Sequence, residues 1–256
     1  MKKIDPRSYL IVALDVGSSA EALELVDRLK SSVGYFKIGL QLFTSEGPDV
    51  VARVKDSGGG VFLDLKLHDI PNTVAGAVVE AVSHGVDLLT LHTLGGARMM
   101  RRAREALDEI STRTPVPRLL GVTVLTSMDA EELENIGIRD SIPDAVLRLA
   151  RLARNCGMDG LVCSPRELTR LQNEGIRDLF YVTPGIRPAD TSADDQKRIT
   201  TPRDAIRMGA RHIVVGRPIV RADRPEEAAA RILRDIESGL QYRDSGYNDQ
   251  DGGPPG

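Results

Sequence analysis

The stretch FLDLKLHDIPNT, residues 62–73, places Asp64, Lys66 and Asp69 in an otherwise apolar run. Asp64 and Lys66 are two residues apart, so on a β-strand both point to one face, with Cα atoms about 7 Å apart. The leucines between and beside them point to the other face. Because an unpaired buried charge is costly, we expect Lys37, in a neighbouring apolar run, to join this pair. Neighbouring carboxylates favour the ammonium form of Lys66. Such an ammonium stabilises negative charge that develops on a bound molecule, and then donates a proton to it.

Asp69 differs from the other two charges. It lies three residues after Lys66, and Pro71 ends the strand just beyond it. Two interpretations stay open at this point. Asp69 either caps the helix that the sequence PNTVAGAVVEAV predicts, or projects into another subunit.

Eight short apolar runs alternate with amphipathic segments, and each run has the length of a buried strand. The runs span residues 9–16, 35–40, 60–67, 87–93, 119–126, 160–164, 179–185 and 212–220. This alternation predicts an α/β fold, a single (β/α)8 TIM barrel over residues 1–240. The polar, Gly/Pro-rich residues 241–256 are predicted to be a disordered tail. A doubly wound open sheet is the alternative, but the turn DVGSSAEA after the first run lacks the G-x-G-x-x-G pattern.

A second group of candidate residues follows the seventh and eighth runs, in the sequences VTPGIRP and VVGRPIV. Barrels commonly bind phosphate in the loops after strands seven and eight. Gly185 and Gly216 would let the backbone approach an anion, and Arg217 supplies a planar pair of donors. Pro184 precedes the first of these glycines. Two connections, residues 127–143 and 186–200, are unusually long, and long loops are often binding loops.

Composition excludes several classes of function. The net charge of −3 argues against a broad nucleic-acid footprint, and no apolar run approaches the roughly 20 residues of a membrane-spanning helix. At the N-terminus, Asp5, Pro6 and Arg7 interrupt any signal-peptide core. The two cysteines, Cys156 and Cys163, form neither a disulfide framework nor a metal-ligand spacing. We therefore expect a soluble, cytoplasmic protein without bound metal.

These residues and motifs resemble the orotidine 5'-phosphate decarboxylase family, in its bacterial type. The signature D-x-K-x-x-D-I-P-N-T runs here from Asp64 to Thr73. The supporting matches are ALDV at Asp15, FKIG at Lys37, VTVLTSM through Ser127, VTPGIRP at Gly185, Gln196 in the long loop, and VVGRPI at Arg217. The resemblance covers residues 9–237, and its motifs occur in order on successive predicted strands.

The resemblance implies a homodimeric (β/α)8 barrel that needs no metal or organic cofactor and converts orotidine 5'-phosphate to UMP and CO₂ in de novo pyrimidine synthesis. It also implies a role for each matching residue. Lys37, Asp64 and Lys66, with Asp69 of the partner subunit, would surround the reacting carbon, and Lys66 would stabilise and protonate the C6 carbanion. Asp15, and Thr73 from the partner side, would bind the ribose; Ser127 would bind the pyrimidine; Gln196 and Arg217 would bind the phosphate.

Two other functions compete with this one. Sugar-phosphate enzymes of the same superfamily, such as 3-keto-gulonate-6-phosphate decarboxylase and hexulose phosphate synthase, share the D-x-K-x-x-D core. They hold Mg²⁺ with a glutamate on the second strand, where this chain has Lys37, whose ammonium would repel a metal. A phosphate-binding barrel without catalysis is the other alternative, in which the charged residues would be only structural.

Overall fold

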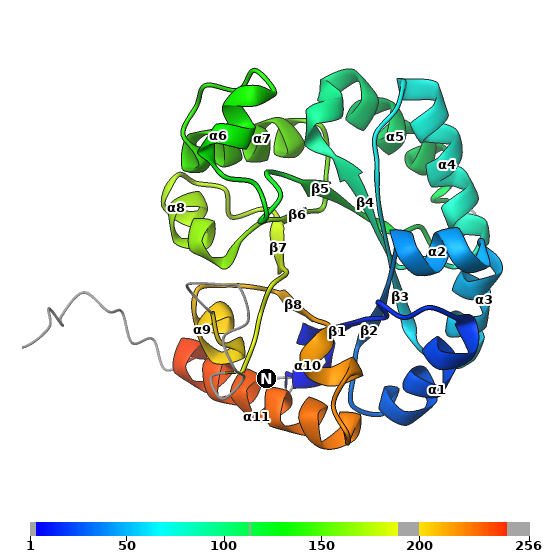
Figure 1. Ribbon diagram of the computed structural model, residues 1–256. Coiled ribbons are helices and arrows are strands. Elements are labelled where there is room, and N and C mark those ends of the chain that lie inside the picture. The colour runs from blue at the N-terminus through cyan, green and yellow to red at the C-terminus, as the bar shows by residue number, and fades with distance from the viewer. Residues whose placement is uncertain (1–3, 113, 189–199, 245–256) are drawn as a thin grey trace, which may run out of the picture.

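A closed parallel barrel organises the computed structural model, which describes residues 4–112, 114–188 and 200–244. Its strands pair in sequence order and the eighth pairs with the first, so the described residues confirm the predicted (β/α)8 barrel (Figure 1). The strands are β1 (Leu10–Ala13), β2 (Tyr35–Gly39), β3 (Gly60–Leu67), β4 (Leu88–His92), β5 (Arg118–Val122), β6 (Gly160–Val162), β7 (Phe180–Thr183) and β8 (His212–Val215).

The helices form the outer layer around these strands. The main ones are α1 (Ser19–Leu29), α2 (Leu40–Glu46), α3 (Asp49–Asp56), α4 (Pro71–Ser83), α5 (Gly96–Ile110), α6 (Ala130–Asn135), α7 (Ile142–Asn155), α8 (Leu168–Asn173), α9 (Pro202–Arg207), α10 (Arg217–Val220) and α11 (Pro225–Asp244). Short 3₁₀ helices lie at Pro6–Tyr9 (η1), Thr93–Gly95 (η2) and Pro165–Glu167 (η3). None of the described helices is long and apolar enough to cross a membrane.

Two helix starts follow the signals in the sequence. Ser18 caps α1 by accepting from the backbone N–H of Glu21, and Thr201 caps α9 by accepting from that of Asp204. Such side-chain caps satisfy backbone donors that the first helical turn leaves unpaired. The long connection at residues 127–143 contains α6, and α11 continues to Asp244, past the predicted domain end at residue 240.

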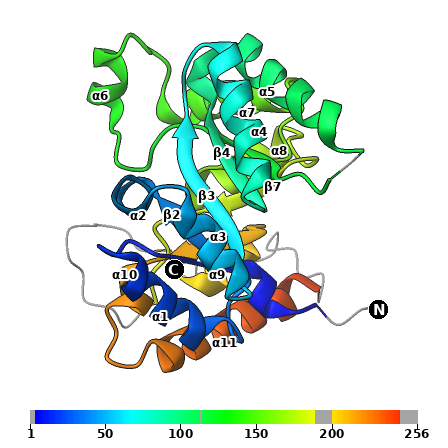
Figure 2. The same ribbon diagram turned by 90° about the vertical axis from the view of Figure 1, so that its right-hand side faces the viewer.

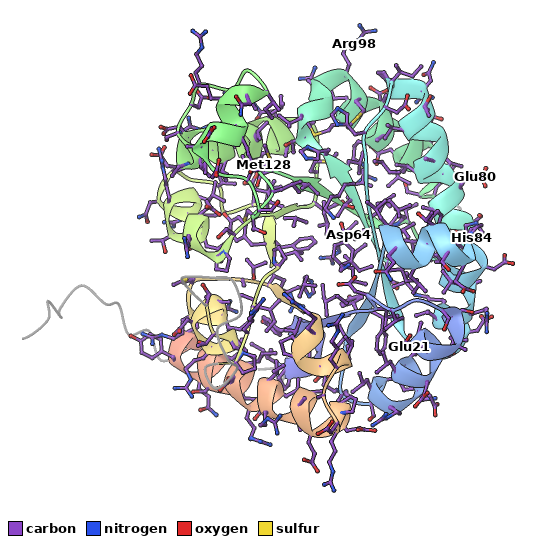
Figure 3. All side chains as sticks on the ribbon, in the orientation of Figure 1. Glu21, Asp64, Glu80, His84, Arg98 and Met128 are labelled. Carbon is purple, nitrogen blue, oxygen red and sulfur yellow. The ribbon has the colours of Figure 1, made fainter. Side chains whose placement is uncertain are left out.

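The core has two layers because each strand buries both of its faces. The larger layer lies between strands and helices and includes Leu63, Leu65 and Leu67. The smaller layer fills the barrel interior; among its residues are Phe62 of β3 and Leu88 of β4. Side chains alternate along a strand, so Asp64, two residues after Phe62, also faces the interior. Figure 3 shows Asp64 near the centre of the ring, whereas Glu80, His84 and Arg98 lie on its outer side.

Several apolar runs extend past the hydrogen-bonded strands. The run at residues 212–220 was expected to be one strand, but β8 ends at Val215 and Arg217 begins the short helix α10. Pro218, at the second position of this helix, cannot donate to a strand ladder and is well tolerated in a first helical turn.

In the side view of Figure 2, α2, α6 and α10 lie on one side of the molecule. Each of the three follows the carboxyl end of a strand, so this side is the mouth of the barrel.

Candidate active site

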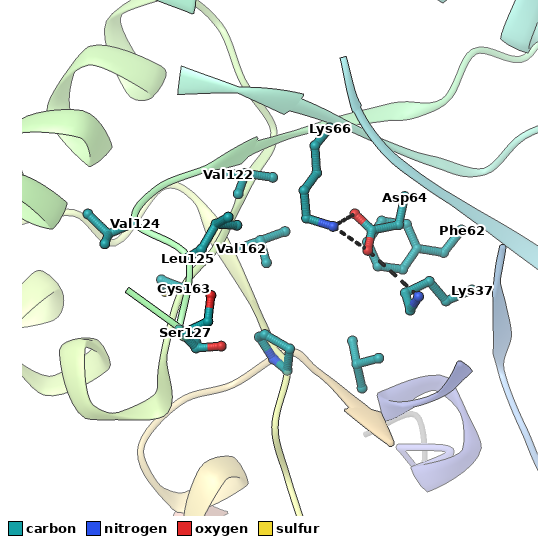
Figure 4. Close-up of a pocket in the computed structure, with 13 residues that line it drawn as sticks. Lys37, Phe62, Asp64, Lys66, Val122, Val124, Leu125, Ser127, Val162 and Cys163 are labelled. Carbon is teal, nitrogen blue, oxygen red and sulfur yellow. Dashed lines mark hydrogen bonds and ion pairs between the residues drawn. The ribbon is translucent and has the colours of Figure 1, made fainter. Parts of the chain in front are cut away.

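A cavity of about 220 Å³ opens at the carboxyl end of the barrel. Figure 4 shows Lys37, Asp64 and Lys66 along one wall, with Val122 and Val162 across from them. Ser127 and Pro184 line the same cavity, so five of the predicted site residues, from four different connections or strands, come together here. The site therefore combines a charged wall with an apolar one, which suits a flat ring that carries one charged substituent.

One carboxylate connects the two lysines of the charged wall. Nζ of Lys66 lies 2.9 Å from each carboxylate oxygen of Asp64, and Nζ of Lys37 lies 3.8 Å from Oδ2 of Asp64. The side chains of Asp64 and Lys37 are only 12% and 13% exposed. The expected Lys–Asp array thus exists within one chain, and each buried charge has a partner of opposite sign, as burial demands.

The strand that carries this array is not regular. Leu63 pairs with Leu89 and Leu67 with Leu91, so β3 uses two more residues than β4 between these points. Within this bulge, Lys66 has φ of +50°, a conformation that is uncommon outside glycine. The sequence interpretation assumed an uninterrupted strand. The bulge instead re-aims Lys66, as bulges beside active sites commonly do.

Thr90 of β4 is a site residue that the sequence interpretation missed. Its Oγ1 accepts from the backbone N–H of Lys66 at 2.8 Å and donates to Oδ1 of Asp64 at 3.0 Å. It is fully buried and faces the barrel interior two residues after Leu88. The available signal was a lone threonine among the leucines of DLLTLH, but its partners depend on the strand register.

Lys37 is held from a second side by Asp15, which follows β1. Nζ of Lys37 lies 3.1 Å from Oδ1 of Asp15. A Cβ atom on Gly39 would stand 2.8 Å from the same Nζ atom, so the absence of a side chain at Gly39 leaves room for the lysine. The side chain of Asp15 is 53% exposed and so is accessible from the mouth of the barrel.

The predicted phosphate residues lie at the ends of β7 and β8. Pro184 and Gly185 directly follow β7, and Gly185 has φ of +76°, where a larger residue would be strained. Gly216 is the N-cap of α10 and Arg217 its first residue, with an exposed side chain. Gln196 lies outside the described residues. Of the four described residues, only Pro184 lines the cavity with the charged wall, so the phosphate site stays a prediction.

Asp69 and Thr73 do not join the other site residues within the described chain. Both are exposed, and neither lines the cavity. Asp69 accepts at Oδ1 from the N–H of Ile70 at 2.6 Å. The N-cap of α4 is Ile70, with no side-chain cap hydrogen bond, so the interpretation of Asp69 as a helix cap is wrong. Pro71 in the first turn has no N–H to offer to a cap.

Two other titratable groups near the site are held neutral. Burial, followed by the charges of His68 and Lys66, lowers the pKa of His92, whose ring stacks on His68 at a centroid distance of 5.6 Å. Burial raises the pKa of the Cys163 thiol, which lines the cavity and therefore contributes an apolar surface at neutral pH. Among the described residues, no group of three or more His, Cys, Asp and Glu side chains is arranged to hold a metal ion.

The fold and the site define a class: a (β/α)8-barrel enzyme whose cavity is built from lysine and aspartate side chains at the strand ends. Within that class, the chain belongs to the orotidine 5'-phosphate decarboxylase / HUMPS family, which it matches over residues 8–232. This match confirms the resemblance seen in the motifs.

Similar proteins support the same assignment. Orotidine 5'-phosphate decarboxylase of Nitrosospira multiformis is 49% identical over 91% of this chain and 95% of its own length. The enzyme of the same name from Pelobacter propionicus is also 49% identical, over 93% of this chain and 99% of its own. The crystal structure of orotidine 5'-phosphate decarboxylase from Lactobacillus acidophilus superposes with a TM-score of 0.78, at 38% identity, over 89% of this chain and 98% of that one.

Proposed function

We propose that this enzyme converts orotidine 5'-phosphate to UMP and CO₂, the last step of de novo pyrimidine synthesis, without a metal or organic cofactor. The observation that carries the proposal is the array of Lys37, Asp64 and Lys66 in one cavity at the barrel mouth. The relatives that cover nearly the whole chain bear the name of this enzyme.

The chemistry fits an ammonium at this position. Loss of CO₂ from C6 of the pyrimidine leaves an electron pair in the plane of the ring, where the π system cannot accept it. Protonated Lys66 stabilises this pair by its charge and then donates a proton to the same carbon. One ion pair at ~4 Å with an effective dielectric near 20 contributes about 4 kcal/mol, and that corresponds to roughly three decades of rate.

A hard decarboxylation needs more than one ion pair, and we propose two further sources. Asp64 crowds the substrate carboxylate in the ground state and repels it. Binding energy from the phosphate, which lies away from the reacting carbon, holds the substrate in this unfavourable contact. Lys37 forms ion pairs with both Asp15 and Asp64, so it keeps the Asp64 carboxylate in place while the substrate enters.

The remaining residues bind the rest of the substrate in this proposal. Ser127 contacts the pyrimidine edge from the wall opposite Lys37, and Asp15 binds the ribose. Gln196 and Arg217 bind the phosphate, together with the backbone at Pro184, Gly185 and Gly216. Thr73 reaches the ribose from the partner subunit.

We propose a homodimer that shares its active sites. Three exposed apolar side chains follow the carboxyl ends of three adjacent strands: Leu40 after β2, Ile70 after β3 and Leu94 after β4, exposed by 59%, 67% and 38%. Burial of such neighbouring apolar groups favours association. Asp69 precedes Ile70 and would then reach the partner's cavity.

We further place the enzyme in the cytoplasm, free of nucleic acid and membrane.

Absorbance at the pyrimidine band after addition of orotidine 5'-phosphate tests the function. We expect substrate loss and stoichiometric CO₂, unchanged after treatment with EDTA. No turnover of this substrate, with Mg²⁺-dependent turnover of a sugar phosphate, would establish the alternative enzyme class. Binding of phosphate compounds without any turnover would establish a binding protein.

A further inference from the structure

We propose that Thr90 is a positioning residue for the decarboxylation, an inference that rests on the function proposed above. Its single hydroxyl holds the Asp64 carboxylate and the Lys66 backbone together. Thr90 does not line the cavity, so it acts through the two charged residues and does not touch the substrate.

The strand register creates the need for such a residue. Between the pairs Leu63–Leu89 and Leu67–Leu91, β3 has three residues where β4 has only Thr90. Three β3 residues cannot all find a backbone partner on one β4 residue. The N–H of Lys66 is therefore left to a side chain, and Thr90 Oγ1 accepts it at 2.8 Å.

The hydroxyl then links the backbone to the charged wall. A hydroxyl accepts and donates at once, so after accepting from the Lys66 N–H it donates to Oδ1 of Asp64 at 3.0 Å. Nζ of Lys66 closes the ring by bonding to the same Oδ1 at 2.9 Å. Backbone, hydroxyl, carboxylate and ammonium thus restrain one another in a ring of three hydrogen bonds.

Burial makes the threonine hard to replace by solvent. Thr90 is 0% exposed, so its two hydrogen-bond partners have no contact with bulk solvent at this point when the hydroxyl is removed. Without the hydroxyl, the left-handed Lys66 loses the partner of its N–H, and the Asp64 carboxylate keeps its two lysines but loses the neutral contact that fixes its side-chain torsion. Both changes move the ammonium away from the position where the C6 electron pair forms, and a small displacement of a catalytic group is costly in rate.

The test compares Thr90→Val, which keeps the shape and deletes the hydroxyl, with Thr90→Ser, which keeps the hydroxyl. Thr93→Val is the matched control, because Thr93 is equally buried and its hydroxyl bonds to the carbonyl of Val122, away from Asp64. For each variant, kcat and KM for orotidine 5'-phosphate, the Kd for UMP and the urea midpoint are measured.

We expect Thr90→Val to lower kcat by about ten- to a hundredfold, as for loss of a hydrogen bond to a charged group. Its KM and its Kd for UMP should stay within about threefold of wild type, since Thr90 makes no contact with the ribose, base or phosphate sites. Thr90→Ser should restore kcat to within about threefold, and Thr93→Val should lose stability but not kcat.

An unchanged kcat in Thr90→Val, or a serine variant as slow as the valine variant, would overturn the positioning role. If the valine variant does not fold, Thr90→Ala replaces it. The alanine variant, which lacks the hydroxyl, must then have a lower kcat than the serine variant, which keeps it. The wild-type enzyme is assayed before any variant. If it leaves orotidine 5'-phosphate intact, the proposed function is refuted, whatever the role of Thr90.

Discussion

Nζ of Lys66 lies at the same distance, 2.9 Å, from both oxygens of Asp64, so the ammonium is bound symmetrically by one carboxylate. In this arrangement Asp64 holds Lys66 in place, and the Lys66 side chain, which lines the cavity, remains 29% exposed. An incoming substrate carboxylate would meet both a positive and a negative charge. The positive charge attracts it, and the negative charge raises the energy of the bound ground state.

Lys66→Ala should abolish turnover, by about a thousandfold or more, because it removes both the charge and the proton. The variant should fold and bind UMP, since the proposed mechanism uses Lys66 in the transition state and not at the phosphate site. Steady-state kinetics and UMP titration provide the measurements. Lys66→Arg serves as a control: it keeps a positive charge but cannot readily release a proton. Activity of Lys66→Ala within tenfold of wild type would remove Lys66 from the mechanism.

Gly39→Ala should reduce kcat with little loss of stability. The new Cβ atom would stand 2.8 Å from Nζ of Lys37, and the flexible end of that lysine can move aside. The fold therefore survives, but Lys37 is displaced from Asp64 and Asp15, and we expect kcat to fall about tenfold or more. Gly17→Ala is the matched control, because nothing lies within 4 Å of a Cβ there. Equal kinetics of the two variants would show that the position of Lys37 is not critical.

Much of the barrel could be predicted from the sequence, because periodic burial is a local property. Each of the eight apolar runs overlaps one strand, but the boundaries differ. The strand β5 begins at Arg118, one residue before its run, and ends at Val122, although the run continues through buried loop residues to residue 126. The bulge at Lys66 could not be predicted, since the two-residue spacing of Asp64 and Lys66 is the same in a regular strand and in a bulged one. The role of Thr90 follows from the register of two strands, which no single segment encodes.

Arg217→Ala should weaken binding of orotidine 5'-phosphate and UMP by about 2–3 kcal/mol, the value of a charge-assisted hydrogen bond. Turnover of orotidine without its phosphate should hardly change, because in the proposed binding mode the arginine contacts only the phosphate. Parallel kinetics with the two substrates provide the measurement. An equal loss for both would mean that Arg217 supports the site in some other way and that the phosphate binds elsewhere.

Acid should destabilise the fold through His212, at the amino end of β8. Burial, with a smaller effect from Arg211, lowers the pKa of this histidine from 6.5 to about 3, and it is 3% exposed. Below pH 6.5 the unfolded chain binds a proton that the folded chain does not. The free energy of unfolding therefore decreases as the pH is lowered, by up to about 1.4 kcal/mol per pH unit. This loss continues to about pH 3, where the folded histidine also protonates.

Urea unfolding at pH 7 and pH 5 measures this effect. His212→Phe should be less stable at pH 7, because it loses the bond between Nδ1 and the carbonyl of Ser8, 2.8 Å long. Its stability should nevertheless change less between the two pH values than that of wild type. His84→Gln, at a half-buried histidine on the outer helix layer, should keep the wild-type difference. If the stability of His212→Phe changes between pH 7 and pH 5 as much as that of wild type, other groups cause the acid sensitivity.

The sharing of active sites across a dimer can be tested with two defective variants. In the part of the chain that the structure describes, Asp69 is exposed, accepts from the N–H of Ile70 and does not line the cavity of its own barrel. If it completes the partner's site, Lys66→Ala and Asp69→Ala damage opposite sites of a hybrid dimer. One site of the hybrid then carries both changes, and the other carries neither.

The experiment unfolds the two nearly inactive variants, mixes them equally and refolds them. With random pairing, about half of the dimers are hybrids, and one of the two sites in each hybrid is intact. The mixture should therefore recover about a quarter of wild-type activity. If Asp69 served its own barrel, every site of the hybrid would still carry one change, and mixing would restore nothing. Native mass spectrometry counts the hybrids, so hybrids without recovered activity would assign Asp69 to its own subunit and refute the shared site.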